Sequence, residues 1–371
     1  MPKDVSLAAD GTDINGVPSF RYAALTSRLG LDITAPEFKG YHIGGKIEAD
    51  FYAGISGRTG TAQLRLRQAY ATIGKGSRTW KIGQAWHPMA IDIPDIFSLE
   101  SGAPFGPFSR TPQVNFNLKI AKSWSFDVSA IWQMQYTSTG PEGASANYIM
   151  YGCTPETYVG FNFKSGRHVF KIGGDVVTIK PRRYAYSSEG KALNKVSDYL
   201  TTFNAFIYGQ TGAGPWTLKA KATYTQDGSH MNIVGGYGVS EVLKDGSFKY
   251  TPTQTVSVWM TNSFKLGDWT PQFLIAYTRN LGTLQDVLPV EVYGSDGKDA
   301  KSFWCKNSAD KICSMYRIQP EVLYNIGKFQ IGLEYMMTAA QYGKSGARKV
   351  ARTDLHWVYN NRLQAIVKFT F

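Results

Sequence analysis

Apolar and polar positions alternate along most of this 371-residue chain. The segment WTLKAKATY (216–224) carries its apolar residues at one parity and its polar residues at the other, and so does QVNFNLKIA (113–121) for its large apolar residues. A period of two residues is typical of β-strands, and no comparable stretch repeats with the helical period of 3.6. The pattern therefore predicts an all-β protein.

The connections between these segments are alternately short and long. Short Gly-containing turns separate some strands, and long polar segments separate the others, at residues 87–112, 137–155, 180–198, 226–252, 282–313 and 340–360. This rhythm is typical of an outer-membrane barrel with short periplasmic turns and long extracellular loops. A soluble barrel with aromatic residues packed at its rim is the alternative.

The segments predict one domain over residues 1–371, a transmembrane antiparallel β-barrel with about fifteen strands visible. The first of them lies near 19–31 and the sixth near 123–136. Because single-chain bacterial barrels have even strand numbers, we expect sixteen. The missing strand is either absent, together with a signal peptide, or a short strand at 3–8 within the N-terminal segment 1–18.

The final segment, NRLQAIVKFTF, places Leu363, Val367, Phe369 and Phe371 on one face, with Ile366 as the apolar exception on the other. In a barrel the apolar face meets lipid, which predicts a bacterial outer-membrane location in contact with lipid and lipopolysaccharide. Aromatic residues such as Trp124, Tyr136 and Phe329 stand at strand ends, as in interfacial girdles.

The opposite face of each strand then lines water. The formal net charge is +12, and Lys and Arg outnumber Asp and Glu on this face about two to one. Such a lining favours small anionic solutes. Nucleic acid is not expected as a partner, because the cations are spread along the chain. The predicted pore-lining residues are Arg28, Lys46, Glu48, Asp50, Arg65, Arg67, Lys81, Arg110, Lys119, Lys219 and Lys221.

Arg65 and Arg67 are two residues apart on one strand, beside the acid pair Glu48 and Asp50 on the preceding strand. Acids that face bases across a pore make a transverse field, and acids paired with bases along the wall make a ladder of ion pairs; both arrangements fit the pattern.

The segment 87–113 is rich in Pro and Gly and more apolar than a solvated loop. Inward folding, which would narrow the channel beside Asp92, Asp95, Glu100 and Arg110, is favoured over packing against a neighbouring subunit.

Catalytic, metal and cofactor sites are not predicted. The five histidines are scattered without a hydrolase or zinc-protease motif, and the three cysteines form no C-x-x-C pair. Cys305 and Cys313 either bridge a loop or stay unpaired. A passive porin is the favoured function, and a surface adhesin or receptor that uses the long loops is the alternative.

Five segments resemble DcaP-like porins of the outer membrane: TSRLGLDI, GGKIEADFYAG, AQLRLRQAYATIG, WKIGQAWHP and SGAPFGPFSRTPQVNFN, in this order within residues 26–118. The resemblance implies a homotrimer of sixteen-stranded barrels that takes up small anionic solutes such as dicarboxylates. It also implies that Arg28, Arg65, Arg67 and Arg110 are pore arginines. The N-terminal helical extension of family members is not recognisable in this chain.

Overall fold

The computed structural model describes residues 1–53, 63–98, 100–297 and 300–371. Strands dominate it, and its helices are short: α1 (Asn147–Gly152) and the 3-10 turns η1 (Pro88–Ala90) and η2 (Gly228–Met231). None of the helices within the described ranges has the length and apolar character needed to cross a membrane.

The strands form one large antiparallel sheet of 17 and a separate pair, β9 (Tyr184–Tyr186) with β10 (Ala192–Lys195). The first half of the large sheet comprises β1 (Arg28–Thr34), β2 (His42–Ala53), β3 (Gln63–Lys75), β4 (Arg78–Trp86), β5 (Arg110–Lys119), β6 (Trp124–Ile131), β7 (Glu156–Ser165) and β8 (His168–Ile179). The second half comprises β11 (Leu200–Ala213), β12 (Trp216–Gln226), β13 (Gly235–Val242), β14 (Phe248–Phe264), β15 (Trp269–Thr283), β16 (Phe303–Lys306), β17 (Ile312–Ile326), β18 (Phe329–Ser345) and β19 (Ala351–Phe369).

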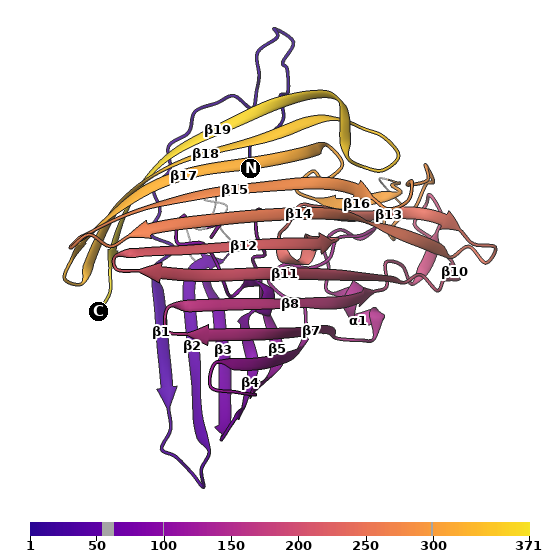
Figure 1. Ribbon diagram of the computed structural model, residues 1–371. Coiled ribbons are helices and arrows are strands. Elements are labelled where there is room, and N and C mark those ends of the chain that lie inside the picture. Colours follow the sequence, from indigo (N-terminus) through magenta and orange to yellow (C-terminus); the bar gives the residue numbers. More distant parts are fainter. Residues whose placement is uncertain (54–62, 99, 298–299) are drawn as a thin grey trace.

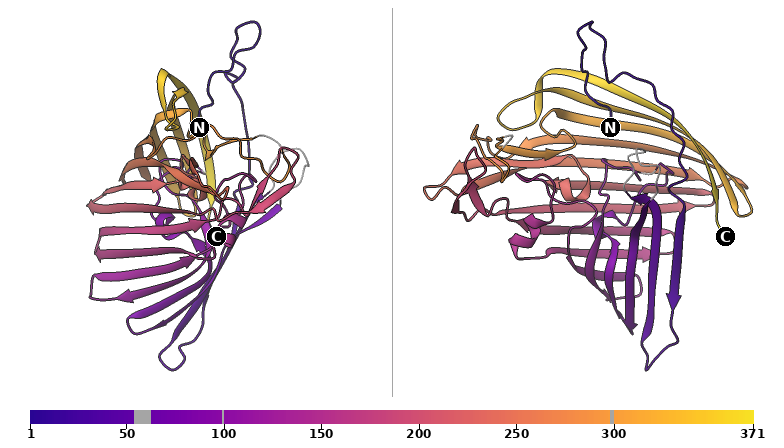
Figure 2. Two further views of the ribbon diagram at one scale, coloured as in Figure 1. Left: turned by 90° about the vertical axis from the view of Figure 1, so that its right-hand side faces the viewer. Right: turned by 180° about the vertical axis from the view of Figure 1, so that it is seen from behind.

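The wall is an up-and-down meander. Each strand from β1 to β8 pairs with the next, β8 pairs with β11, and the pairing then runs through β12, β14, β15, β17 and β18 to β19. The wall curves strongly, with β1 and β19 at its two edges (Figures 1 and 2). Among the described residues no ladder joins these two edges.

The two faces of the wall have opposite character, as the alternation predicts. In β14, Val258 is 40% exposed on the convex face, whereas its neighbour Ser257 is 2% exposed on the concave face. Phe203 and Ile207 of β11 are likewise exposed, and Asn204 is buried. Apolar side chains thus point outward around the wall, and most polar ones point inward.

The structure corrects several predicted boundaries. The first strand begins at Arg28 rather than near residue 19: its ladder with β2 starts where Arg28 lies opposite Asp50, and among the described residues only the bond from the Phe51 amide to the Leu25 oxygen continues beyond it. No strand occupies residues 3–8, where Leu7 makes an isolated bridge to Asp13.

β6 ends at Ile131, so Tyr136 lies in the following loop, where its ring packs against Phe108. The long loop expected at 340–360 is instead the short connection 346–350, because β18 and β19 continue to pair beyond their apolar parts. Two long loops carry β13 and β16, which pair with each other at the outer end of the wall.

The three cysteines are unpaired. Cys153 is exposed directly after α1, Cys313 is buried, and Cys305 is partly buried. The bridge between Cys305 and Cys313, one of the two alternatives from the sequence, is therefore absent.

Candidate functional site

The connection from β4 to β5, residues 87–109, folds onto the concave face of the wall; we call it the inward loop. It is shorter than the predicted segment 87–113, because Arg110 to Gln113 belong to β5 and pair with β4. Ion pairs hold it at Asp92, 2.7 Å from Lys171, and at Asp95, 2.6 Å from Lys219.

Farther along, the inward loop reaches the other side of the wall. The backbone amides of Phe97 and Ser98 donate to the carboxylates of Glu321 on β17 and Glu334 on β18. The Glu100 carboxylate lies 3.6 Å from Arg317 and 3.4 Å from Arg362. The inward loop therefore crosses the interior from β8 to β19.

Apolar residues of the inward loop explain why it is not solvated. Met89 and Phe105 are fully buried. They belong to a cluster with inward-facing side chains of the wall, including Tyr208 and Trp259. Such large apolar side chains favour burial, so this part of the concave face forms an apolar seat for the inward loop.

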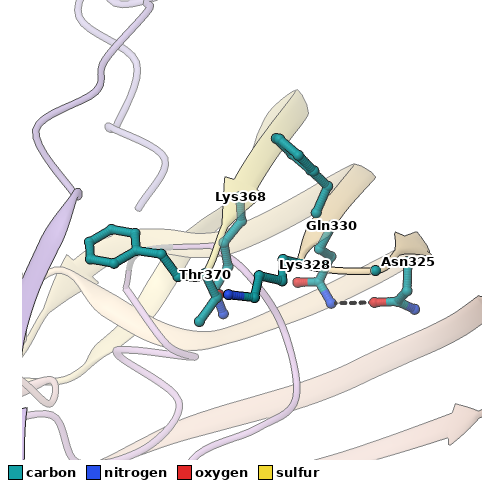
Figure 3. Close-up of a pocket in the computed structure, with 8 residues that line it drawn as sticks. Asn325, Lys328, Gln330, Lys368 and Thr370 are labelled. Atoms are coloured by element: carbon teal, nitrogen blue, oxygen red, sulfur yellow. Dashed lines mark hydrogen bonds between the residues drawn. The ribbon is translucent and has the colours of Figure 1, made fainter.

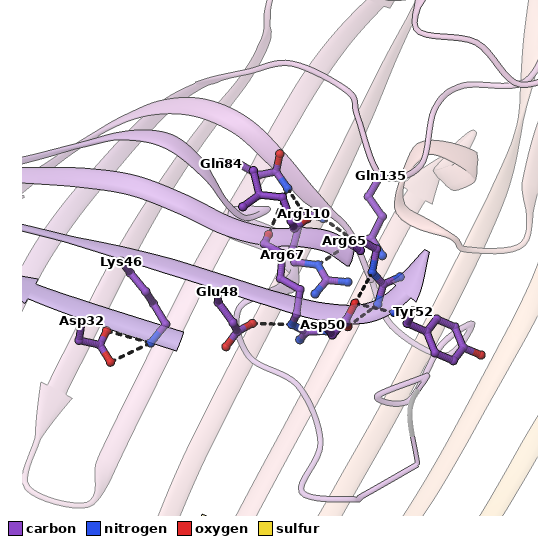
Figure 4. A network of polar contacts seen from close by, with 11 residues as sticks. Asp32, Lys46, Glu48, Asp50, Tyr52, Arg65, Arg67, Gln84, Arg110 and Gln135 are labelled. Carbon is purple, nitrogen blue, oxygen red and sulfur yellow. Dashed lines mark hydrogen bonds and ion pairs between the residues drawn. The ribbon is translucent and has the colours of Figure 1, made fainter. Parts of the chain in front are cut away.

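The arginines of β3 pair directly with the acids of β2 (Figure 4). Arg65 binds both oxygens of Asp50 at 2.9 and 2.6 Å. Arg67 binds Glu48 at 2.5 Å and Asp50 at 2.8 Å. Of the two arrangements that the sequence allowed, the structure has the ladder of ion pairs along one wall, with no field across the pore between these four groups.

Two further guanidinium groups belong to residues beside this ladder. Arg28 of β1 lies opposite Asp50 in the strand register. Arg110 donates to Gln135 at 3.0 Å (Figure 4). Its guanidinium also lies over the ring of Trp86, 4.9 Å from the ring centre. We call Arg28, Arg65, Arg67 and Arg110, with Glu48 and Asp50, the arginine cluster.

The arginine cluster carries four positive and two negative side chains. Arg110 is 2% exposed, and its Nη1 has no hydrogen-bond partner among the described residues. A buried guanidinium N–H without a partner is costly, and carboxylates match the planar fork of Arg. The geometry is therefore suited to an anion.

The predicted lysines have different surroundings. Lys46 pairs with Asp32 at 2.9 Å, apart from the arginine cluster (Figure 4). Lys219 is held by Asp95, and Lys221 donates to the backbone oxygen of Met89. Lys81 lies over the ring of Tyr70, and Lys119 is exposed at the end of β5.

The acids of the inward loop change the charge balance that the strands alone predict. Asp92, Asp95 and Glu100 pair with Lys171, Lys219 and Arg317, three cations of the strands. The positive excess on the concave face is therefore smaller; part of it lies at the arginine cluster and part at Lys81 and Lys221, which have no carboxylate partner among the described residues.

Sequence reasoning missed a second buried group beneath the start of the inward loop. Nε2 of His87 lies 2.6 Å from Oε1 of Glu156, and Nε2 of His230 lies 3.5 Å from the same oxygen. Burial lowers the pKa of His230, and the nearby Glu156 carboxylate raises it more, to about 9. The residues are far apart in sequence, so only inward folding brings them together.

A hollow also lies at the turn between β17 and β18, beside the end of β19 (Figure 3). Lys328, Lys368 and Phe371 line it together with Asn325 and Gln330. Since it sits at a short turn next to the edge of the wall, away from the inward loop, it is not a candidate for the solute path.

Comparisons with known proteins agree with this geometry. Residues 3–115 match the family described as DcaP outer membrane protein. No curated protein sequence matches the chain.

Among solved structures, the outer membrane channel DcaP of Acinetobacter baumannii is similar with a TM-score of 0.68 and 19% identity, covering 97% of this chain and 89% of that one. The anion-selective porin from Comamonas acidovorans gives a TM-score of 0.51 at 11% identity, covering 92% of this chain and 90% of the porin. The trimer form of OmpT, an outer membrane protein of Vibrio cholerae, gives 0.50 at 12% identity, covering 91% and 88%.

These findings confirm the predicted class of antiparallel membrane β-barrel and the outer-membrane location. The resemblance drawn from the sequence is confirmed as well: residues 3–115 match the DcaP outer membrane protein family, and the chain as a whole has the fold of the outer membrane channel DcaP.

Proposed function

We propose that this protein is a passive diffusion channel that prefers small anions, with dicarboxylates as its solute class. The observation that carries the proposal is the arginine cluster, in which four guanidinium groups stand beside only two carboxylates. Arg65 and Arg67 are already paired with acids, so we assign the exposed Arg28 to contact with the solute and the buried Arg110 to its electrostatic attraction.

The inward loop supports the proposal by its position. It crosses the concave face and is held at both sides by ion pairs and hydrogen bonds. A fixed loop narrows the path, so that a passing solute comes close to the side chains of the wall. A dicarboxylate can then exchange water for the fork of the exposed Arg28, while the buried charge of Arg110 attracts it from behind the surface.

We also propose a homotrimer embedded in outer-membrane lipid and lipopolysaccharide. One similar structure is described as a trimer form, and the convex face carries the apolar side chains that lipid requires. Electrophoresis of unboiled samples is expected to show a high-mass band that heating converts to the monomer.

Planar bilayers test the anion preference. Under a salt gradient, the reversal potential of the wild-type channel is expected to show chloride permeating better than potassium, and succinate on one side is expected to permeate. Arg28→Gln with Arg110→Gln should reduce the anion preference and leave the Arg65 and Arg67 ladder intact. Lys122→Gln, in the exposed turn after β5, is the matched control. A wild-type channel that prefers cations would overturn the proposal.

A further inference from the structure

Four ionisable side chains are buried together between the inward loop and the wall. His87 begins the inward loop, Glu156 is the first residue of β7, Asp175 lies on β8, and His230 lies on η2. Each is at most 2% exposed. The ligand atoms of His87, Glu156 and Asp175 all lie within 4.8 Å of one another. Four elements of the chain thus place two imidazoles and two carboxylates together.

Several atoms of this group are left without hydrogen bonds. Among the described residues, Oε2 of Glu156, Oδ2 of Asp175 and both ring nitrogens of His230 accept or donate no hydrogen bond, although Nε2 of His230 lies 3.5 Å from Oε1 of Glu156. A buried polar atom that lacks a partner costs about 1–3 kcal/mol, and a charged group costs more. Within the same described ranges, no Lys or Arg pairs with either carboxylate. Among these four side chains only the imidazoles can therefore carry positive charge.

Neighbouring side chains hold the free atoms in place. Nδ2 of Asn204 donates to Oδ1 of Asp175 at 2.6 Å, and the amide oxygen of Asn204 accepts from the backbone N–H of Gln226. This leaves Oδ2 of Asp175 as its free ligand atom. Partners that orient ligands in this way are typical of metal sites.

We propose that His87, Glu156 and Asp175 bind one divalent transition-metal ion of the Zn²⁺ type, with His230 as the fourth ligand. Mixed imidazole and carboxylate donors suit such ions, whereas Ca²⁺ and Mg²⁺ prefer oxygen donors alone. A divalent cation neutralises both carboxylates, with which no Lys or Arg of the described residues pairs.

Binding alters one contact of the inward loop. The Met89 amide donates to Nδ1 of His87 at 3.2 Å, so a neutral His87 ring carries its proton on Nε2. When Nε2 binds the ion, the ring carries its proton on Nδ1 and gives up the Met89 hydrogen bond. Because His87 is the first residue of the inward loop, the ion ties this end of the loop to β7 and β8.

The experiment uses the full-length protein, purified in detergent and treated with EDTA. Titration with Zn²⁺ in a calorimeter is expected to show one ion per chain, and Co²⁺ is expected to give the visible absorption of a site with nitrogen and oxygen ligands. Glu156→Gln and Asp175→Asn each should weaken Zn²⁺ binding by at least about 10–100-fold, the range for disturbed metal sites. His42→Gln removes an exposed histidine and should leave binding unchanged.

Two results would overturn the proposal. One is the absence of saturable Zn²⁺ binding and of a Co²⁺ spectrum in the wild type. The other is binding that the Glu156 and Asp175 variants keep and His42→Gln loses, which would assign the ion to surface histidines. Since the Co²⁺ spectrum is read on the wild type, the test holds even where a variant fails to fold.

Discussion

Asp50 is the residue around which the arginine cluster is built. It is 1% exposed and accepts hydrogen bonds from both Arg65 and Arg67. Alternation alone predicts that Asp50 lies beside these arginines. Residues two positions apart on one strand, such as Arg65 and Arg67, share a face, and Asp50 belongs to the same face of the neighbouring strand. Alternation did not show that the arginines would bind it directly, because that depends on rotamers and on the bulge between Glu48 and Ala49.

The Asp50 carboxylate lowers the positive charge of the arginine cluster and also stabilises the fold, and its replacement separates these two effects. Asp50→Asn adds one positive charge to the arginine cluster, so the anion preference should rise, while the loss of ionic hydrogen bonds should lower stability by about 1–3 kcal/mol. Reversal potentials and the temperature at which the folded band disappears in electrophoresis measure the two effects. Asp268→Asn, in an exposed turn, is the control. A fall in anion preference would contradict the assignment of the cluster.

Position 83 in β4 requires glycine for two reasons: its backbone conformation and the lack of room for a side chain. Its φ is +128°, and a Cβ there would lie 2.3 Å from the backbone oxygen of Ala69. Gly83→Ala is therefore expected to cost at least about 1–3 kcal/mol through strain and to lower the folded fraction after refolding in detergent. Gly209→Ala in β11 is the matched control, because a Cβ there meets nothing within 4 Å. Equal folding of both variants would contradict this account.

At the scale of elements, the strands were predictable and the contacts of the loops were not. The period of two residues identifies strands such as β12 and β14 because each has one face toward lipid and one toward the interior. The position of His87 beside Glu156, 69 residues later, depends on how the inward loop folds. No local pattern encodes that path, so the buried histidine pair was missed.

The inward loop was recognisable as an apolar connection, but its partners were not. Asp92, Asp95 and Glu100 were expected near the constriction; their pairing with Lys171, Lys219 and the arginines of β17 and β19 was not. Phe105 anchors the middle of the loop, fully buried and 5.0 Å from the Arg317 guanidinium.

Loss of this anchor should loosen the inward loop. Phe105→Ala is expected to remove about 3–5 kcal/mol of packing at the loop and so to increase the fluctuation of single-channel current and the rate of proteolysis within residues 100–109. Phe264→Ala makes the same chemical change at an outward-facing position that is 41% exposed, and it should alter neither measurement. A steady current in Phe105→Ala would show that other contacts hold the loop.

For the molecule as a whole, the convex face decides where the protein is stable. Val256, Val258 and Met260 stand exposed on one strand alone, and comparable residues continue around the wall. An apolar band of this extent is stable against hydrocarbon and not against water. The protein is therefore expected to precipitate when detergent is removed.

A charge placed in this band tests its contact with lipid. Val258→Arg should destabilise the protein by about 2–4 kcal/mol in a bilayer, the cost of Arg near the midplane on the lipid face. Val258→Leu keeps the site apolar and should fold as the wild type does. The comparison is made by urea unfolding in vesicles, and equal stability of the two variants would place this face away from lipid.

The three cysteines offer a reporter of orientation without any engineering. Cys153 is exposed beside α1, while burial raises the pKa of the Cys305 thiol to about 12 and Cys313 is buried. A maleimide reacts with thiolates that it can reach, so a membrane-impermeant dye should label intact cells through a single position. Fluorescence from a dye bound at Cys153 would thus report, on living bacteria, that the end of the wall beside α1 faces the outside.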